Sequence, residues 1–266
     1  MKSNGLMMRH LVTRIIGTIL RKKIKMESKF LKLSQTLIFL FIPFICIGQL
    51  KFLPKPNGKL VNHTYYSLSY IEDHEQAEWV HYRLDSIMLK GKEKRGNYYF
   101  KQDTTFLTKS VKKIDYWFKK YKYHRGHLAP FKDMKIDSTS ASESFYMSNI
   151  SPQKPSFNTG VWLRLENHVR SLAKKNEIYI TTGGVLKPSL KKIGKEKNIS
   201  VPELFYKIIY DAKNEKMFAY LMPNKKLESI EKYLVTVDSI EVLTGIDFYH
   251  ELEDKLEEKL ESAKNN

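Results

Sequence analysis

Cysteine is almost missing from this sequence of 266 residues, which contains only Cys46. Because Cys46 lies in an apolar segment near the N-terminus, the rest of the chain has no thiol for a disulfide, a cysteine-ligated zinc site or thiol catalysis. Any metal chemistry must therefore use oxygen and nitrogen ligands. The sequence also lacks a Gly-x-Gly-x-x-Gly pattern and a Walker lysine, so Gly183-Gly184 predicts a turn and not a phosphate cradle.

Acidic residues are scarce relative to basic ones, 29 against 46, which gives a formal net charge of +17. Residues 1–49 hold nine basic residues and one acid, so the remaining 37 basic and 28 acidic residues still leave a net charge of +9. Such an excess favours a polyanionic partner such as nucleic acid or an anionic membrane surface. Lysine-rich stretches are each typical of solvated loops, and together they can follow a phosphate backbone without reading sequence; they span 90–94, 112–122 and 187–197.

Long hydrophobic runs are also lacking. The longest run, Leu37–Gly48, has about 12 residues after two lysines, which is short for a transmembrane helix and typical of a signal peptide. We therefore predict that residues 1–49 are an N-terminal extension plus a signal peptide, and that the protein is exported to the periplasm or secreted. A retained membrane anchor is the alternative, which Pro43 inside the run disfavours. The sequence leaves open whether translation starts at Met1 or Met26.

The remaining chain divides into a linker, residues 50–60, and a domain, residues 61–266. The linker contains two prolines and a glycine. Aromatic and β-branched residues predict strands at Tyr65–Tyr70, Trp79–Leu84, Glu177–Thr182, Leu204–Asp211 and Met217–Leu221. Apolar residues at helical spacing predict helices at Asn158–Lys174, where Asn158 is placed as the N-cap, and at Ile230–Tyr233 and Glu251–Ala263. Interleaved strands and helices without an internal repeat predict one α+β domain.

Three short segments hold side chains suited to phosphodiester chemistry: Tyr123–Pro130, Ser148–Gln153 and Phe157–Glu166. A histidine, with a pKa of about 6.5, suits the removal of a proton from water near neutral pH. A metal ion or an arginine supplies positive charge where the phosphorane and the leaving oxygen build up negative charge. Magnesium binds oxygen and often uses only one or two protein ligands, so an asparagine carbonyl at the start of a helix suits it.

These segments resemble the DNA/RNA non-specific endonucleases, an endonuclease G-like group of the ββα-metal superfamily. That family has Asp-Arg-Gly-His before Leu-Ala-Pro, then Asn-Ile-Ser-Pro-Gln, then Asn-x-Gly-x-Trp with Leu-Glu close behind. The chain contains each of these residues except the first aspartate, where His124 stands. The resemblance runs from about Tyr65 to Phe248. It implies an α+β fold with a ββα-metal nuclease core, in which helices flank a central, mainly antiparallel sheet.

The resemblance also implies roles for individual residues. His127 is expected to be the general base, Asn158 the metal ligand, and Arg125 a contact to the phosphate or the transition state. Asn149 and Glu166 are expected to support the catalytic residues. Glu166 lies eight positions after Asn158, about 80° around an ideal helix, so the two would share a broad face.

Two further residues are candidate substrate contacts, Arg95 and His124. The family has an arginine near a Phe-x-x-Asp element, which Phe100–Asp103 matches here, and Arg95 is the nearest arginine although its spacing matches poorly. In place of the family aspartate, His124 can replace part of its hydrogen bonding in one tautomer, and losing the carboxylate is expected to lower the pKa of the base. A zinc site made by His124 and His127 is an alternative that needs a helix, which Pro130 disfavours.

The sequence thus predicts a metal-dependent endonuclease that hydrolyses phosphodiester bonds of DNA and RNA with little sequence specificity. The expected cofactor is Mg²⁺, with Mn²⁺ as the alternative, and no small-molecule cofactor is expected. Nucleic acid is the expected partner, while an inhibitor protein and a homodimer are left open. Two other functions compete: a catalytically silent nucleic-acid-binding protein on the same fold, which His124 keeps open, and a membrane-surface protein that uses the basic N-terminus.

Overall fold

A computed structural model describes residues 51–105, 111–116 and 118–265. All of them belong to one compact unit, Cys46–Asn266. The predicted signal peptide, and the anchor that competes with it, lie outside the described residues. Within the described ranges, no helix combines the length and the apolar character needed to cross a membrane.

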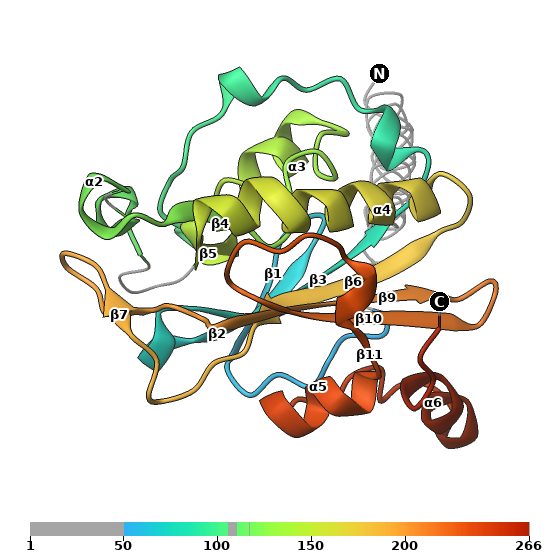
Figure 1. Cartoon of the computed structure of the whole chain (residues 1–266). Helices are drawn as coiled ribbons and strands as arrows, with labels where there is room; N and C mark the ends of the chain where they lie inside the picture. The colour runs from blue at the N-terminus through green and yellow to red at the C-terminus, as the bar shows by residue number, and fades with distance from the viewer. Residues whose placement is uncertain (1–50, 106–110, 117, 266) are drawn as a thin grey trace, which may run out of the picture. The chain divides into compact units, whose positions relative to one another are not determined.

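A seven-stranded sheet forms the middle layer of this unit (Figure 1). Its strands lie in the order β1 (Lys59–Asn62), β2 (Ser67–Ile71), β3 (Gln76–Leu84), β6 (Ile178–Gly184), β9 (Leu204–Asp211), β10 (Lys216–Pro223) and β11 (Leu234–Val235). Each strand pairs antiparallel with its neighbours. The predicted α+β fold with a mainly antiparallel sheet is confirmed.

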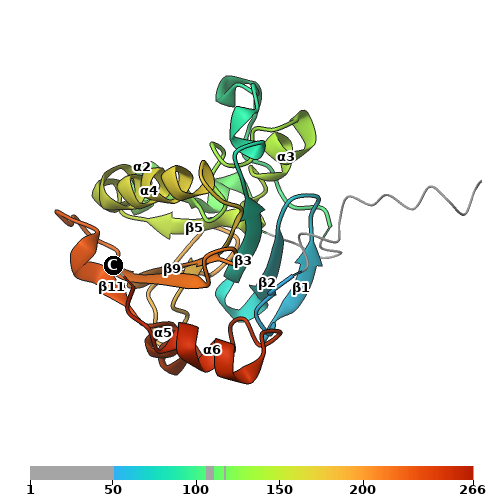
Figure 2. The same cartoon turned by 90° about the vertical axis from the view of Figure 1, so that its right-hand side faces the viewer.

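Helices cover both faces of the sheet (Figure 2). One face carries α2 (Phe118–Tyr121), α3 (Ser138–Glu143) and α4 (Leu163–Ala173), and the other carries α5 (Val237–Thr244) and α6 (Asp254–Glu261). Successive side chains of a strand point to opposite faces. In β9, therefore, Phe205 and Ile209 join the core beneath α4, whereas Tyr206 and Ile208 join the core against the other two helices.

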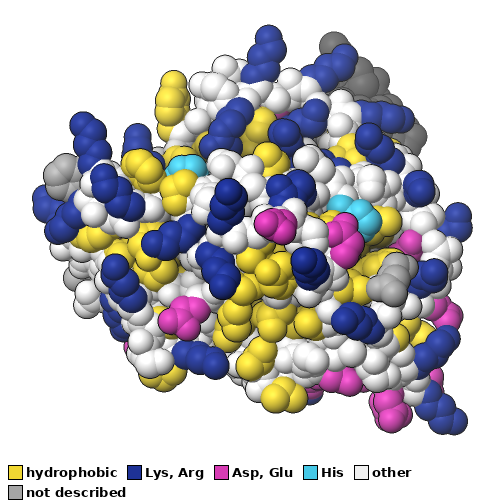
Figure 3. Space-filling view, viewed as in Figure 1, with side chains coloured by type: hydrophobic (Ala, Val, Ile, Leu, Met, Phe, Trp, Pro, Cys, Tyr) yellow, Lys and Arg dark blue, Asp and Glu magenta, His cyan; other side chains and the backbone are white. Residues whose placement is uncertain are grey.

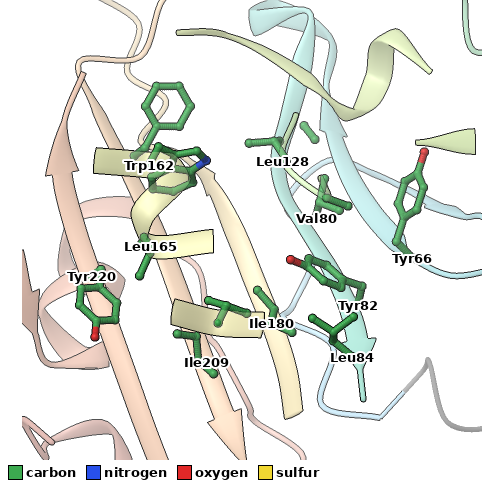
Figure 4. Packing of buried hydrophobic residues seen from close by; sticks show 14 of the residues in the cluster. Tyr66, Val80, Tyr82, Leu84, Leu128, Trp162, Leu165, Ile180, Ile209 and Tyr220 are labelled. Atoms are coloured by element: carbon green, nitrogen blue, oxygen red, sulfur yellow. The ribbon is translucent and has the colours of Figure 1, made fainter. Parts of the chain in front are cut away.

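The core beneath α4 fixes that helix on the sheet. Trp162 and Leu165 are fully buried and lie above Ile180 and Ile209 of the central strands (Figure 4). Burying one large apolar side chain contributes about 1.5–3 kcal/mol to the free energy of unfolding. The same packing therefore fixes the turn that leads into α4, where Asn158 lies.

A separate two-stranded ribbon carries the first two motifs. Strand β4 (His124–His127) pairs antiparallel with β5 (Ile150–Gln153). Figure 1 shows this ribbon beside the N-terminal end of α4. A smaller ribbon is formed by β7 (Lys192–Ile193) and β8 (Ile199–Ser200), and short 3₁₀ turns occur at Glu72–His74, Met88–Lys90, Arg95–Asn97, Lys113–Tyr116, Met147–Asn149 and Glu231–Tyr233.

The predicted elements differ from the observed ones mainly at short segments. All five predicted strands are confirmed, with bounds that differ by a few residues. The predicted helix Ile230–Tyr233 is wrong, because this segment holds only a single 3₁₀ turn before β11. The predicted helix Glu251–Ala263 is confirmed in a shorter form as α6, and β1 already begins at Lys59, inside the predicted linker.

Candidate active site

Gly126 allows the two strands of the ribbon to pack closely. A Cβ atom at this position would lie 2.1 Å from Oε1 of Gln153 and 2.6 Å from its Cγ, far inside van der Waals contact. The Gln153 side chain is fully buried and has little room to withdraw. The glycine between Arg125 and His127 is therefore a steric requirement of the β4–β5 pairing.

Asn149 clamps the segment that follows β4. Its side-chain Oδ1 accepts a hydrogen bond from the backbone N–H of Ala129 at 2.8 Å, and its Nδ2 donates to the carbonyls of Ala129 and Ser144, both at 2.9 Å. Its own carbonyl accepts from Leu128 N–H at 2.9 Å. The side chain is fully buried, so Asn149 fixes the backbone beyond His127 and does not itself face a ligand.

His127 ends β4 inside an aromatic pocket. Its ring centroid lies 5.3 Å from that of Phe100 and 5.2 Å from that of Phe145, and the residue is 9% exposed. Its Nε2 is buried without a hydrogen-bond partner among the described residues. Burial, together with the positive charge of Arg95, lowers the pKa of His127 to about 3. The ring is therefore neutral near pH 7, which is the state that a general base requires.

Arg95 approaches the same pocket from the turn Arg95–Asn97. Its guanidinium carbon lies 5.1 Å from the centroid of the Phe145 ring, and its charge acts on the pKa of His127. The structure thus brings Arg95 beside the predicted base, although its sequence spacing matched the family pattern poorly.

Asp103, the aspartate of the Phe-x-x-Asp element, has a structural role. It is 1% exposed and accepts hydrogen bonds from His63 Nε2, at 3.0 Å, and from the Ser148 hydroxyl. Ser148 precedes the clamping asparagine in the second motif, so the carboxylate joins the two segments. This junction holds Phe100 against the His127 ring.

Arg125 lies on the Phe100 side of β4. Its guanidinium carbon is 5.4 Å from the Phe100 ring centroid, and its Nη2 donates to the carbonyls of Lys113 at 3.0 Å and Tyr116 at 3.3 Å. Its Nε is buried and has no hydrogen-bond partner in the described part of the chain. Two backbone carbonyls thus hold Arg125, and these hydrogen bonds use only some of its guanidinium N–H groups.

Asn158 lies in a wide helical turn, Phe157–Trp162, that is kinked at Gly160 with φ −102° and ψ −108°. The prediction that Asn158 caps a regular helix is wrong, because α4 begins only at Leu163 and the backbone N–H of Asn158 already bonds to the Lys154 carbonyl at 2.9 Å. Wide turns of this kind are frequent at functional sites, because the extra residue redirects side chains. The Asn158 side chain is left available for other contacts.

The Asn158 side chain contacts His124 at the start of β4. Its amide Nδ2 lies 3.1 Å from Nδ1 of His124, and since an amide nitrogen only donates, the imidazole accepts as the neutral ring. Burial lowers the pKa of His124, which favours that neutral form. The amide Oδ1 makes no hydrogen bond to any described residue. A half-turn of the amide would bring Oδ1 beside the imidazole, and an amide oxygen with an imidazole nitrogen is a donor set that suits a hydrated divalent cation.

Glu166 belongs to a different cluster. The kink before α4 removes the ideal helical relation to Asn158, and the Glu166 carboxylate lies 3.9 Å from Arg170 Nη2. Arg170 Nη1 donates to Asp133 at 2.8 Å, and burial raises the pKa of Glu166 while the charge of Lys207 opposes that rise. The described contacts thus tie Glu166 to a buried charge network beneath α4.

Lys207 is the member of this network that sequence reasoning missed. It is fully buried, and its Nζ lies 4.8 Å from the centroid of the Trp162 ring. Burial lowers the pKa of Lys207. The available signal was its place in a strand that sends Phe205, Lys207 and Ile209 to the same face.

The histidine pair on β4 does not form the alternative zinc site. His124 and His127 are three apart on a strand, so their side chains leave on different sides. Within the described ranges, the one group of three closely spaced His or acidic side chains is Asp238, Glu241 and Glu261. It belongs to α5 and α6, across the sheet from β4 (Figure 1).

Basic side chains are spread over the face that carries α2 and α4. In the view of Figure 3, which includes α2 and α4, lysine and arginine side chains outnumber the acidic ones that lie among them. The distribution is typical of a surface that binds a polyanion through its backbone charges.

Comparison with known proteins decides the family. A family profile described as DNA/RNA non-specific endonuclease matches residues 48–255. The chain belongs to the DNA/RNA non-specific endonuclease family. The resemblance drawn from the three motifs is thereby confirmed.

Individual relatives support the same assignment. The mitochondrial endonuclease G of Caenorhabditis elegans is 33% identical over 217 residues, covering 74% of this chain and 70% of that protein. A nuclease from Nostoc is 30% identical over 227 residues, covering 79% and 80%. The mitochondrial nuclease EXOG of Danio rerio is 29% identical over 220 residues, or 76% of this chain, and the match spans 64% of that relative's length.

A solved structure matches the fold as well. A chain from the crystal structure of an EndoG/EndoGI complex, described as showing the mechanism of EndoG inhibition, aligns with a TM-score of 0.69 at 28% identity. The alignment covers 75% of this chain and 89% of the other.

The predicted export to the periplasm or the medium is contradicted by these relatives. The endonuclease G and EXOG proteins from worm, zebrafish and human are mitochondrial nucleases. A basic stretch before a short apolar run does not by itself separate a secretory signal from other targeting segments. The prediction rested on that pattern alone.

Proposed function

We propose that this protein is a metal-dependent endonuclease that cuts phosphodiester bonds of DNA and RNA with little sequence specificity. One observation carries the proposal: in a chain of this family, β4 ends in a histidine kept neutral inside an aromatic pocket. Family membership and the spread of basic side chains in Figure 3 support it.

His127 serves as the general base in this proposal. It takes a proton from the attacking water through the unprotonated nitrogen of its neutral ring. Its low pKa keeps it neutral but makes it a weak base. A bound phosphate beside Arg95 offsets the cation that depresses this pKa, so the base strengthens when substrate binds.

Asn158, whose side chain lies next to His124, would hold a divalent cation through its Oδ1. When bound, such a cation supplies positive charge for the pentacovalent phosphate and the leaving 3′ oxygen. Mg²⁺ is the ion that the family resemblance implies. Arg125 and Arg95 add fixed positive charge around the scissile phosphate, and contacts to phosphates alone do not distinguish DNA from RNA or read sequence.

Cleavage assays on the full chain test this proposal. Supercoiled plasmid and a structured RNA are incubated with MgCl₂ or with EDTA, using the wild type, His127→Ala and His168→Ala. His168 is a half-buried histidine of α4 and serves as the matched control. We expect both substrates to be cut only with the metal, about 100-fold or more slowly by His127→Ala, and at the wild-type rate by His168→Ala. Binding without cleavage by the wild type would favour the silent nucleic-acid-binding alternative.

A further inference from the structure

His124 offers a ring nitrogen to the place where the metal ion would bind. Its Nδ1 lies 3.1 Å from the side-chain amide of Asn158, and both side chains are half-buried, within reach of a hydrated ion. We propose that His124 is a second protein ligand of the cation held by Asn158, and that this imidazole shifts selectivity from Mg²⁺ toward transition-metal dications such as Mn²⁺. The inference rests on the proposed nuclease site.

The separation of the two side chains matches a pair of neighbouring ligands. Ligands at adjacent corners of an octahedron, each about 2.1 Å from the ion, are about 3 Å apart. Without an ion, the Asn158 amide donates its N–H to Nδ1 of His124. A half-turn of the amide exchanges nitrogen for oxygen at nearly the same place. Entry of a cation then replaces one hydrogen bond by two coordination bonds, with little movement of the backbone.

Both backbones are fixed before any ion arrives. The N–H of Asn158 bonds to the Lys154 carbonyl at 2.9 Å, and His124 lies opposite Gln153 in the β4–β5 ribbon. The Phe118 ring lies 5.4 Å from the His124 ring and limits its motion on one side. A ligand pair held in this way loses little conformational entropy on binding.

Glu166, the acidic side chain that the sequence placed near Asn158, is not available for this position. Glu166 is engaged beneath α4 with Arg170 and Lys207. In the described part of the chain, the one group of three His or acidic side chains lies instead on α5 and α6. The coordination set that we propose at Asn158 is therefore one amide oxygen, one imidazole nitrogen and water. Oxygen-only sets suit Mg²⁺, whereas imidazole favours transition metals.

Pulsed electron paramagnetic resonance of Mn²⁺ added to the full chain, without nucleic acid, tests the inference directly. We expect electron spin-echo modulation from a directly bound imidazole ¹⁴N in the wild type. It should persist in His127→Asn, which removes the other histidine of β4, and disappear in His124→Asp, which still binds Mn²⁺. Circular dichroism confirms that each variant is folded.

Calorimetric titrations with Mn²⁺ and Mg²⁺ give a second readout. His124→Asp should lower the ratio of Mn²⁺ to Mg²⁺ affinity about tenfold or more. Bound Mn²⁺ without nitrogen modulation in the wild type would overturn this inference and leave the nuclease proposal standing. Failure of the wild type to bind either ion would overturn both.

Discussion

The two ends of β4 carry the same residue type in different surroundings. His127 lies between the rings of Phe100 and Phe145, almost without exposure, and the charge that acts on it is a cation. His124 is half-buried beside the amide of Asn158. Burial lowers the pKa of both rings, so both are neutral at pH 7. In the proposed mechanism, these neighbours distinguish the two roles: an enclosed ring suits proton transfer, and a ring beside an amide suits an ion.

Removing the proposed metal ligand Asn158 should slow cleavage more than substituting His124 or Arg95. We expect Asn158→Ala to slow cleavage about 100-fold or more, because the ion that stabilises the transition state is lost. Asn158→Asp, which keeps an oxygen at the same place, should retain metal-dependent activity. Single-turnover rates at saturating Mg²⁺ and Mn²⁺ measure both. Equal rates for Asn158→Ala and the wild type would place the ion elsewhere.

A substitution within β4, between His124 and His127, should destabilise the strand that positions both histidines. In Gly126→Ala the new Cβ meets the buried Gln153 side chain, so we expect the free energy of unfolding to fall by about 1–3 kcal/mol. Urea denaturation measures the change. Gln153→Ala in the same chain should restore part of the loss, and no restoration would show that the clash lies elsewhere.

Replacing His124, at the start of β4, should change the metal preference and leave the proposed general base His127 intact. We expect His124→Asp to raise the ratio of Mg²⁺-supported to Mn²⁺-supported cleavage about tenfold, because a carboxylate replaces an imidazole. Rates measured across concentrations of each ion give the ratio. An unchanged ratio, with both ions still active, would assign His124 a purely structural role.

The smallest expected effect concerns pH. A base with a pKa of about 3 stays neutral above that value, so the acid limb of kcat/KM should lie well below pH 6.5. Arg95→Gln removes the nearby cation that lowers this pKa, and the limb should therefore move to higher pH. Rates measured from pH 3 to pH 8 report it. An acid limb near pH 6.5 in the wild type would contradict the lowered pKa expected of a histidine enclosed in this pocket.

Sequence reasoning predicted the large elements and the residues of the motifs, but not all of their contacts. The strand Leu204–Asp211 is found with the same bounds, because its composition and its burial agree. The wide turn before α4 was not predictable, since apolar spacing at Val161 and Leu165 is the same for a regular helix. The positions of Glu166 and Lys207 depend on that turn and on long-range packing, which local periodicity does not contain.

The most direct test of the account compares binding with cutting in one variant of the full chain. His127→Ala is measured for DNA affinity by fluorescence anisotropy in Ca²⁺, and for single-turnover cleavage in Mg²⁺, with His168→Ala as the control. The account predicts an unchanged DNA affinity and a cleavage rate about 100- to 10,000-fold lower for His127→Ala alone. Cleavage by His127→Ala at the wild-type rate would contradict the central claim that the enclosed histidine is the base.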